Sequence, residues 1–123
     1  MVIARTAVRI LLGLLFIAAG IMSVVVTQPP LMPGPGGQLS LLFAQTHWNW
    51  FIGAAQIAIG VLLVINRYVM LALTMLFAFL YNSFAYHITT SPQALPVPIV
   101  VLALALFAGW PYRERFGALF AAR

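Results

Sequence analysis

Two long stretches of this sequence contain no side chain with a fixed charge, and they restrict the fold more than any other feature. One lies between Arg9 and Arg67, and the other lies between Arg67 and Arg113. Only 6% of the residues are charged and 64% are hydrophobic, whereas a soluble domain carries about 25% charged residues. A water-soluble fold could not cover its surface from this composition. The sequence therefore predicts an integral membrane protein that crosses the bilayer several times.

Four apolar segments predict membrane-spanning helices. Each is close to the roughly 20 residues that an α-helix needs to cross about 30 Å of hydrocarbon, although the second and fourth are short. A signal peptide is disfavoured for the first segment, because its apolar run is long and no A-x-A-like site follows it. We expect one membrane domain, residues 1–123, folded as an all-α four-helix bundle. Its helices are expected at about 5–26, 48–65, 68–87 and 95–110, followed by an interfacial tail at 111–123.

The basic residues predict the orientation of this bundle. Basic side chains are retained on the cytoplasmic side of a membrane, so both termini and the turn at 66–67 are expected to be cytoplasmic. The bilayer is then the first partner. The basic residues are scattered rather than gathered on one face, so the net charge of +5 does not indicate a nucleic-acid partner. The six topology-setting residues are Arg5, Arg9, Arg67, Arg113, Arg115 and Arg123.

The connecting segments have their own patterns. The stretch 29-PPLMPGPGG-37 cannot be helical throughout, because proline lacks a backbone donor and glycine is costly in a helix. The stretch 38-QLSLLFAQTHWNW-50 is typical of a short interfacial helix that runs into the second span. In the tail, four apolar side chains share one helical face beside three arginines, so the tail is expected to lie on the inner leaflet. These four are Tyr112, Phe116, Leu119 and Phe120.

Glycines seven residues apart mark one face of the first two spans. The segment 12-LGLLFIAAGIMSVV-25 aligns with 52-IGAAQIAIGVLLVI-65, which matches Gly13 with Gly53 and Gly20 with Gly60. Small residues allow membrane helices to approach closely. We interpret the match as two helices that each need a close-packed face, and an internal duplication is the alternative.

Six polar side chains are expected near the outer ends of the second and third spans. Gln56 lies within about 60° of the Gly53/Gly60 face at 100° per residue, so it should face the bundle. Ser83 stacks below His87, and Asn82 stacks below Tyr86 on the neighbouring face. The predicted ligand-binding set, which shares one pocket open to the outer face, is Gln56, Asn82, Ser83, Tyr86, His87 and His47.

Each of these residues also has a purely structural interpretation. Gln56 and Asn82 would bond to each other or to carbonyls across helices, which stabilises membrane bundles by about 0.6–2 kcal/mol a bond. Ser83 would bond to the carbonyl four residues earlier. His87 and Tyr86 would reach headgroups from the helix end, and His47 would be a helix-start residue.

The chemistry of this set favours a quinone or a small aromatic ligand. Histidine and amide groups bond to carbonyl or hydroxyl oxygens, while aromatic side chains enclose the ring. Haem ligation by His47 and His87 is disfavoured, because nothing in the sequence fixes the separation of the two histidines or matches their depths in the membrane. No metal site is expected, since neither acid nor thiol accompanies them, and Ser83–His87 catalysis lacks an orienting carboxylate. The chain has no cysteine, which excludes thiol chemistry of its own.

Several stretches resemble the DoxX-like family of small bacterial membrane proteins. They are 9-RILLGLLFIAAG-20, 29-PPLMPGPGGQ-38, 51-FIGAAQIAIGVLLVINRYVMLAL-73, with its Asn66-Arg67-Tyr68 turn, and 82-NSFAYH-87. The resemblance implies a multi-pass protein of the bacterial inner membrane. It also implies association with oxidoreductases, of which a thiosulfate:quinone oxidoreductase and redox-stress complexes are family examples. Asn82 and His87 carry over as positions of the family pattern, and no catalytic residue does.

The predicted function is thus a subunit or partner of a quinone-linked oxidoreductase. Two alternatives stay open. One is an oligomeric carrier or pore for a small hydrophobic solute, using the glycine faces of the first two spans. The other is a membrane anchor for a soluble enzyme, bound through residues 113–123.

Overall fold

The computed structural model describes residues 2–26 and 32–121, and there it contains helices and no strand. The segment that is predicted to be interfacial does form a helix, but this helix starts at Gly34 rather than at Gln38. The third predicted span continues to Thr90, past its expected end at His87. The helices are α1 (Val2–Val25), α2 (Gly34–Gln45), α3 (Trp48–Val64), α4 (Val69–Thr90), η1 (Pro92–Ala94), α5 (Pro96–Gly109), η2 (Trp110–Tyr112) and α6 (Arg113–Ala118).

Three helical runs within the described residues are long and apolar enough to cross a membrane. They are α1, α4 and the combined run Pro92–Ala118. The pair α2 and α3 passes the same criterion only together, and it is bent by 88°. Helix α3 alone has 17 residues, or about 26 Å at 1.5 Å per residue, which is short for a membrane crossing.

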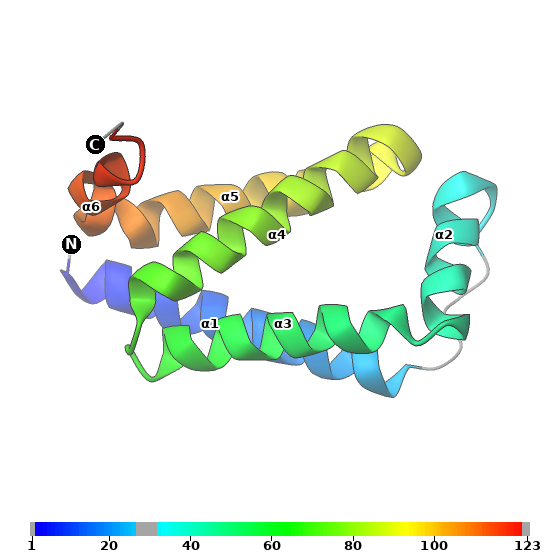
Figure 1. Cartoon of the computed structure of the whole chain (residues 1–123), viewed down its shortest axis with the longest axis horizontal. Helices are drawn as coiled ribbons and strands as arrows, with labels where there is room; N and C mark the ends of the chain where they lie inside the picture. The colour runs from blue at the N-terminus through cyan, green and yellow to red at the C-terminus, as the bar shows by residue number, and fades with distance from the viewer. Residues whose placement is uncertain (1, 27–31, 122–123) are drawn as a thin grey trace.

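The helices form two layers that separate toward one end of the molecule. Figure 1 shows α1 and α3 in one layer and α4 and α5 in the other, with α2 standing across the wider end. We call the end that holds α6 and the α3–α4 turn the closed end, and the end that holds α2 and η1 the open end. Both described chain ends, Val2 and Ala121, lie at the closed end.

Paired glycines set the register between α1 and α3. A methyl group added at Gly13 would lie 2.8 Å from the carbonyl oxygen of Gly60, and one added at Gly53 would lie 2.6 Å from that of Gly20. The two helices are therefore antiparallel, with Gly13 against Gly60 and Gly20 against Gly53. The glycine faces meet within one chain, so an oligomeric pore would have to use other faces.

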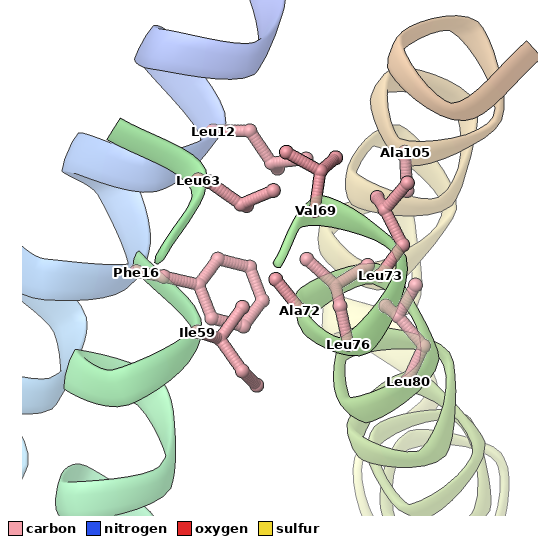
Figure 2. Close-up of a cluster of buried hydrophobic side chains, with 10 residues drawn as sticks. All are labelled: Leu12, Phe16, Ile59, Leu63, Val69, Ala72, Leu73, Leu76, Leu80 and Ala105. Atoms are coloured by element: carbon pink, nitrogen blue, oxygen red, sulfur yellow. The ribbon is translucent and has the colours of Figure 1, made fainter. Parts of the chain in front are cut away.

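The apolar core fills the closed half of the space between the layers. Figure 2 shows side chains of α1 and α3 facing those of α4 and α5. Burial of a Leu or Phe side chain stabilises a soluble fold by roughly 1.5–3 kcal/mol, whereas in lipid the gain comes from close packing. The buried cluster comprises Leu12, Phe16, Ile59, Leu63, Val69, Ala72, Leu73, Leu76, Leu80 and Ala105.

Aromatic and basic residues tie the closed end together. The Arg5 guanidinium lies 5.9 Å from the centroid of the Phe107 ring. In the tail, Phe116 packs edge-to-face on Phe77 with ring centroids 5.6 Å apart. The first part of the tail thus packs on α4, whereas Phe120 is exposed, and the expected place of the tail on the inner leaflet stays a prediction. Arg123 lies outside the described residues.

Candidate functional site

A cleft of about 860 Å³ opens between α2, α3 and α4 near the open end. We call it the front cleft. Its volume is typical of small-molecule sites, which span roughly 300–1,000 Å³. Among the described residues no charged side chain lines it, and aromatic rings make up much of its wall. The lining residues are Leu39, Ser40, Phe43, Trp48, Phe51, Ile52, Ala55, Phe79, Asn82, Ser83, Ala85, Tyr86, Thr89 and Thr90.

Tyr86 on α4 forms hydrogen bonds with α2 at the end of this cleft. Its hydroxyl donates to the carbonyl oxygen of Gly36 at 2.9 Å and lies 3.1 Å from Ser40 Oγ. A hydroxyl has one proton, so Ser40 must be the donor to Tyr86 when Tyr86 donates to Gly36. Gly36 is buried against the end of α4, where an added methyl group would lie 3.0 Å from the carbonyl oxygen of Thr90. Tyr86 is therefore both a wall of the front cleft and the attachment point of α2.

Asn82 presents polar atoms to the front cleft. Its Nδ2 donates to the carbonyl oxygen of Ala78 within its own helix at 3.0 Å. Among the described residues this is the only hydrogen bond of the Asn82 side chain, so Oδ1 and the second N–H are available to a ligand. The proposed bond between Asn82 and Gln56 is absent.

Ser83 keeps its hydroxyl proton available. His87 Nδ1 lies 2.7 Å from the carbonyl oxygen of Ser83 and 3.4 Å from Ser83 Oγ. A carbonyl only accepts, so Nδ1 must carry the proton, and Ser83 Oγ then accepts from His87 rather than donating. The bond from Ser83 to the carbonyl of Phe79, expected from the structural interpretation, is not made.

A second cleft, of about 640 Å³, opens between α1, α4 and α5 on the other side of the bundle. We call it the rear cleft. The part of its lining that the structure describes carries no charge and is apolar apart from Gln56 and Ser83. Its lining residues are Leu15, Phe16, Ala19, Gln56, Phe79, Leu80, Ser83, Pro96, Val97, Pro98, Val100, Val101 and Leu104.

Gln56 faces the bundle interior, as its angular position predicts, with 9% of its surface exposed. Its Oε1 lies 3.1 Å from Ser23 Oγ on α1, which is the cross-helix type of bond that holds membrane helices together. This is the one hydrogen bond of the Gln56 side chain among the described residues, so its Nε2 donors have no partner there.

The two histidines stand on different elements and line neither cleft. His47 lies at the bend between α2 and α3, with a left-handed φ of 60°. Its ring stacks on Trp50 with centroids 4.5 Å apart. The His87 ring folds back along α4 and meets Tyr86 edge-to-face at 5.2 Å. The structure thus joins Asn82, Ser83 and Tyr86 in one cleft, places Gln56 in the other, and separates His47 from both.

Sequence reasoning missed several residues of these clefts. The spacing of Phe79, Ser83, Tyr86 and Thr90 marks one face of a helix at intervals of three and four residues, and this signal could have identified Phe79. Ser40 carries no such signal, because its place beside Tyr86 depends on the bend between α2 and α3.

The two clefts can accept neutral ligands with hydrogen-bonding oxygens. Each offers apolar walls and a few uncommitted donors, and neither offers a counter-charge for an ion. Comparison with protein-family models, curated proteins and solved structures finds no match to this chain.

Proposed function

We propose that this chain is a four-helix integral protein of the bacterial inner membrane that binds a quinone-like ring in the front cleft. In this proposal both termini are cytoplasmic, and the open end lies at the outer leaflet. The chain acts as a membrane subunit or partner of a quinone-linked oxidoreductase. The oxidoreductase link rests on the DoxX-like resemblance of residues 9–20, 51–73 and 82–87.

The observation that carries the ring site is the combination of groups in the front cleft. Phe43, Trp48 and Phe51 line one side, and Asn82 and Ser83 offer uncommitted donors on the other. A quinone is flat, uncharged and apolar, with acceptor oxygens at opposite edges of its ring. Aromatic walls suit its faces and neutral donors suit its oxygens.

Tryptophan fluorescence tests the ring site directly, because Trp48 lines the front cleft and is 59% exposed. Replacing Trp50 and Trp110 with phenylalanine leaves Trp48 as the single emitter among three tryptophans. Titration of the purified protein in detergent with a tail-less methylated naphthoquinone should quench Trp48 saturably. Collisional quenching grows linearly with quinone concentration, and such a result would contradict the proposed ring site.

The polar contacts are tested by two substitutions in the same background. Ser83→Ala and Asn82→Leu should each weaken binding about 2- to 10-fold, since a neutral hydrogen bond contributes about 0.5–1.5 kcal/mol. Thr74→Val is the matched control, because Thr74 lies on α4 outside the front cleft and bonds to its own helix at Met70. Equal affinities in all three variants would contradict the assignment of Ser83 and Asn82.

A further inference from the structure

The front and rear clefts share two residues, Phe79 and Ser83. Both lie on the face of α4 that looks toward the opposite layer, and Phe79 meets Phe16 of α1 edge-to-face at 5.5 Å. The clefts are therefore adjacent, and Phe79 and Ser83 stand at the boundary between them. We call this boundary the neck.

The geometry of the layers explains why this space exists. The apolar core fills the space only toward the closed end, and the layers diverge beyond it (Figures 1 and 2). The front cleft opens at the seam between α3 and α4, and the rear cleft opens at the seam between α1 and α5. A ligand that extended across the neck would therefore reach from one seam to the other.

Gln56 marks the polar side of the neck. Helix α3 otherwise lines only the front cleft, and Gln56 is the one residue of α3 that lines the rear cleft. Its side chain is about nine-tenths buried, and its Nε2 lacks a partner among the described residues. Ser83 adds a hydroxyl to the lining of both clefts. Nε2 is not fully buried, so its unused donors are accessible from the cleft, and in apolar surroundings they favour a ligand oxygen.

Beyond the neck the rear cleft is apolar. Its outer wall consists of Leu15 and Ala19 on α1 and of Val97, Val100 and Leu104 on α5. None of these five side chains can bond to a polar ring substituent, and none is charged. This wall suits a hydrocarbon chain, in contrast to the aromatic wall of the front cleft.

We propose that the ligand is a ring with a long apolar tail of the isoprenoid type. The ring occupies the front cleft, its tail-side oxygen lies at the neck, and its tail passes through the neck into the rear cleft. This inference rests on the proposed function for the ring site, and it adds the second cleft and the class of tail. Both seams would face lipid, so a lipid-soluble ligand enters without crossing water.

Larger side chains in the rear cleft test binding of the tail independently of binding of the ring. Ala19 lines the rear cleft, and its neighbour Ala18 is exposed and does not. In the Trp50/Trp110-substituted background, each alanine would be replaced with leucine or phenylalanine, which leaves Trp48 as the only tryptophan. Each variant would be titrated with a naphthoquinone without a tail and with the same ring carrying a short isoprenoid tail.

Ala19→Phe should weaken binding of the tailed compound by about tenfold or more, since an added ring overpacks the tail path. It should change the affinity for the tail-less compound by no more than about twofold, because it changes no ring contact. Ala18→Phe should change the affinity for either compound by no more than about twofold for the same reason. Val100→Phe repeats the block from α5, with Ala103→Phe as its control, because Val100 lines the rear cleft and Ala103 does not. All four positions are exposed on the helix surface, so the core stays intact.

Each outcome decides one of the two proposals. If Ala19→Phe and Val100→Phe lowered the affinity for both compounds equally, the ring itself would lie in the rear cleft, and the tail assignment would be overturned. Unchanged binding of the tailed compound would overturn it by showing that the tail leaves elsewhere. Absence of saturable quenching by the tail-less compound in the unblocked protein would overturn the proposed ring site, and the tail site with it.

Discussion

At the scale of single residues, Arg9 is the clearest link between the sequence pattern and the packing. Its Nη1 donates to the carbonyl oxygens of Leu63 and Val64, the latter at 3.4 Å, in the last turn of α3. These carbonyls are among those that a helix leaves without internal partners, and they carry the negative end of its dipole. A residue expected only to set the topology therefore also holds the end of α3 against α1.

Replacing Arg9 with methionine should lower the free energy of unfolding by about 1–2 kcal/mol. Charge-assisted hydrogen bonds contribute about 1.5–3 kcal/mol, and the partial exposure of Arg9 reduces that value. Thermal unfolding in detergent, followed by circular dichroism, measures the loss. Arg115→Met is the control, because Arg115 is exposed and only stacks on Tyr112. An equal midpoint for Arg9→Met and Arg115→Met would refute the capping role.

At the scale of helices, the paired glycines decide how closely α1 and α3 approach. Gly20→Ala should destabilise the pair by about 1–3 kcal/mol, because its methyl group would lie 2.6 Å from the Gly53 carbonyl oxygen and the helices must move apart. Gly117→Ala is the matched control, since an added methyl group there meets nothing within 4 Å. That change should be neutral or slightly stabilising through helix propensity. Urea or thermal unfolding of both variants compares them, and equal stabilities would contradict the close approach.

The helices also show where sequence reasoning ends. Gly13 and Gly60 could be identified as contact faces from spacing alone, and Gln56 could be placed on the inner side from its angle to them. Its actual partner, Ser23, follows from the antiparallel register, which depends on glycine contacts between two helices. The grouping of Gln56 with Asn82 was therefore only partly right, because the two line different clefts.

At the scale of the whole molecule, the apolar runs predict the helices well, but they predict poorly how the helices bend and which spaces stay open between them. The bend of 88° between α2 and α3 turns on His47, whose left-handed backbone no local signal indicates. The divergence of the layers follows from where large side chains stop filling the interior, beyond Phe16 and Leu80. Clefts are what the packing leaves open, so they cannot be read from the periodicity of any one helix.

The orientation of the molecule can be tested because the chain contains no cysteine. The described arginines lie toward the closed end. In the proposed orientation α3 crosses as a short span, and α2 lies along the opposite interface. Single cysteines at Gln45 and Gln93 probe the open end, and single cysteines at Glu114 and Ala121 probe the closed end. All four positions are exposed.

A membrane-impermeant maleimide applied to intact cells should label the cysteines at 45 and 93 and spare those at 114 and 121 until the membrane is permeabilised. The reverse pattern would mean that the arginine asymmetry does not set the orientation. If the bent pair α2–α3 entered the membrane and returned to the same side, three spans would remain, so the cysteines at 45 and 93 would be spared and those at 114 and 121 would be labelled. Labelling at 93 but not at 45 would mean instead that α3 crosses the membrane and that the bend at its start lies within it. The front cleft would then face the membrane interior without an outer opening, and only a ligand already dissolved in lipid could reach the ring site.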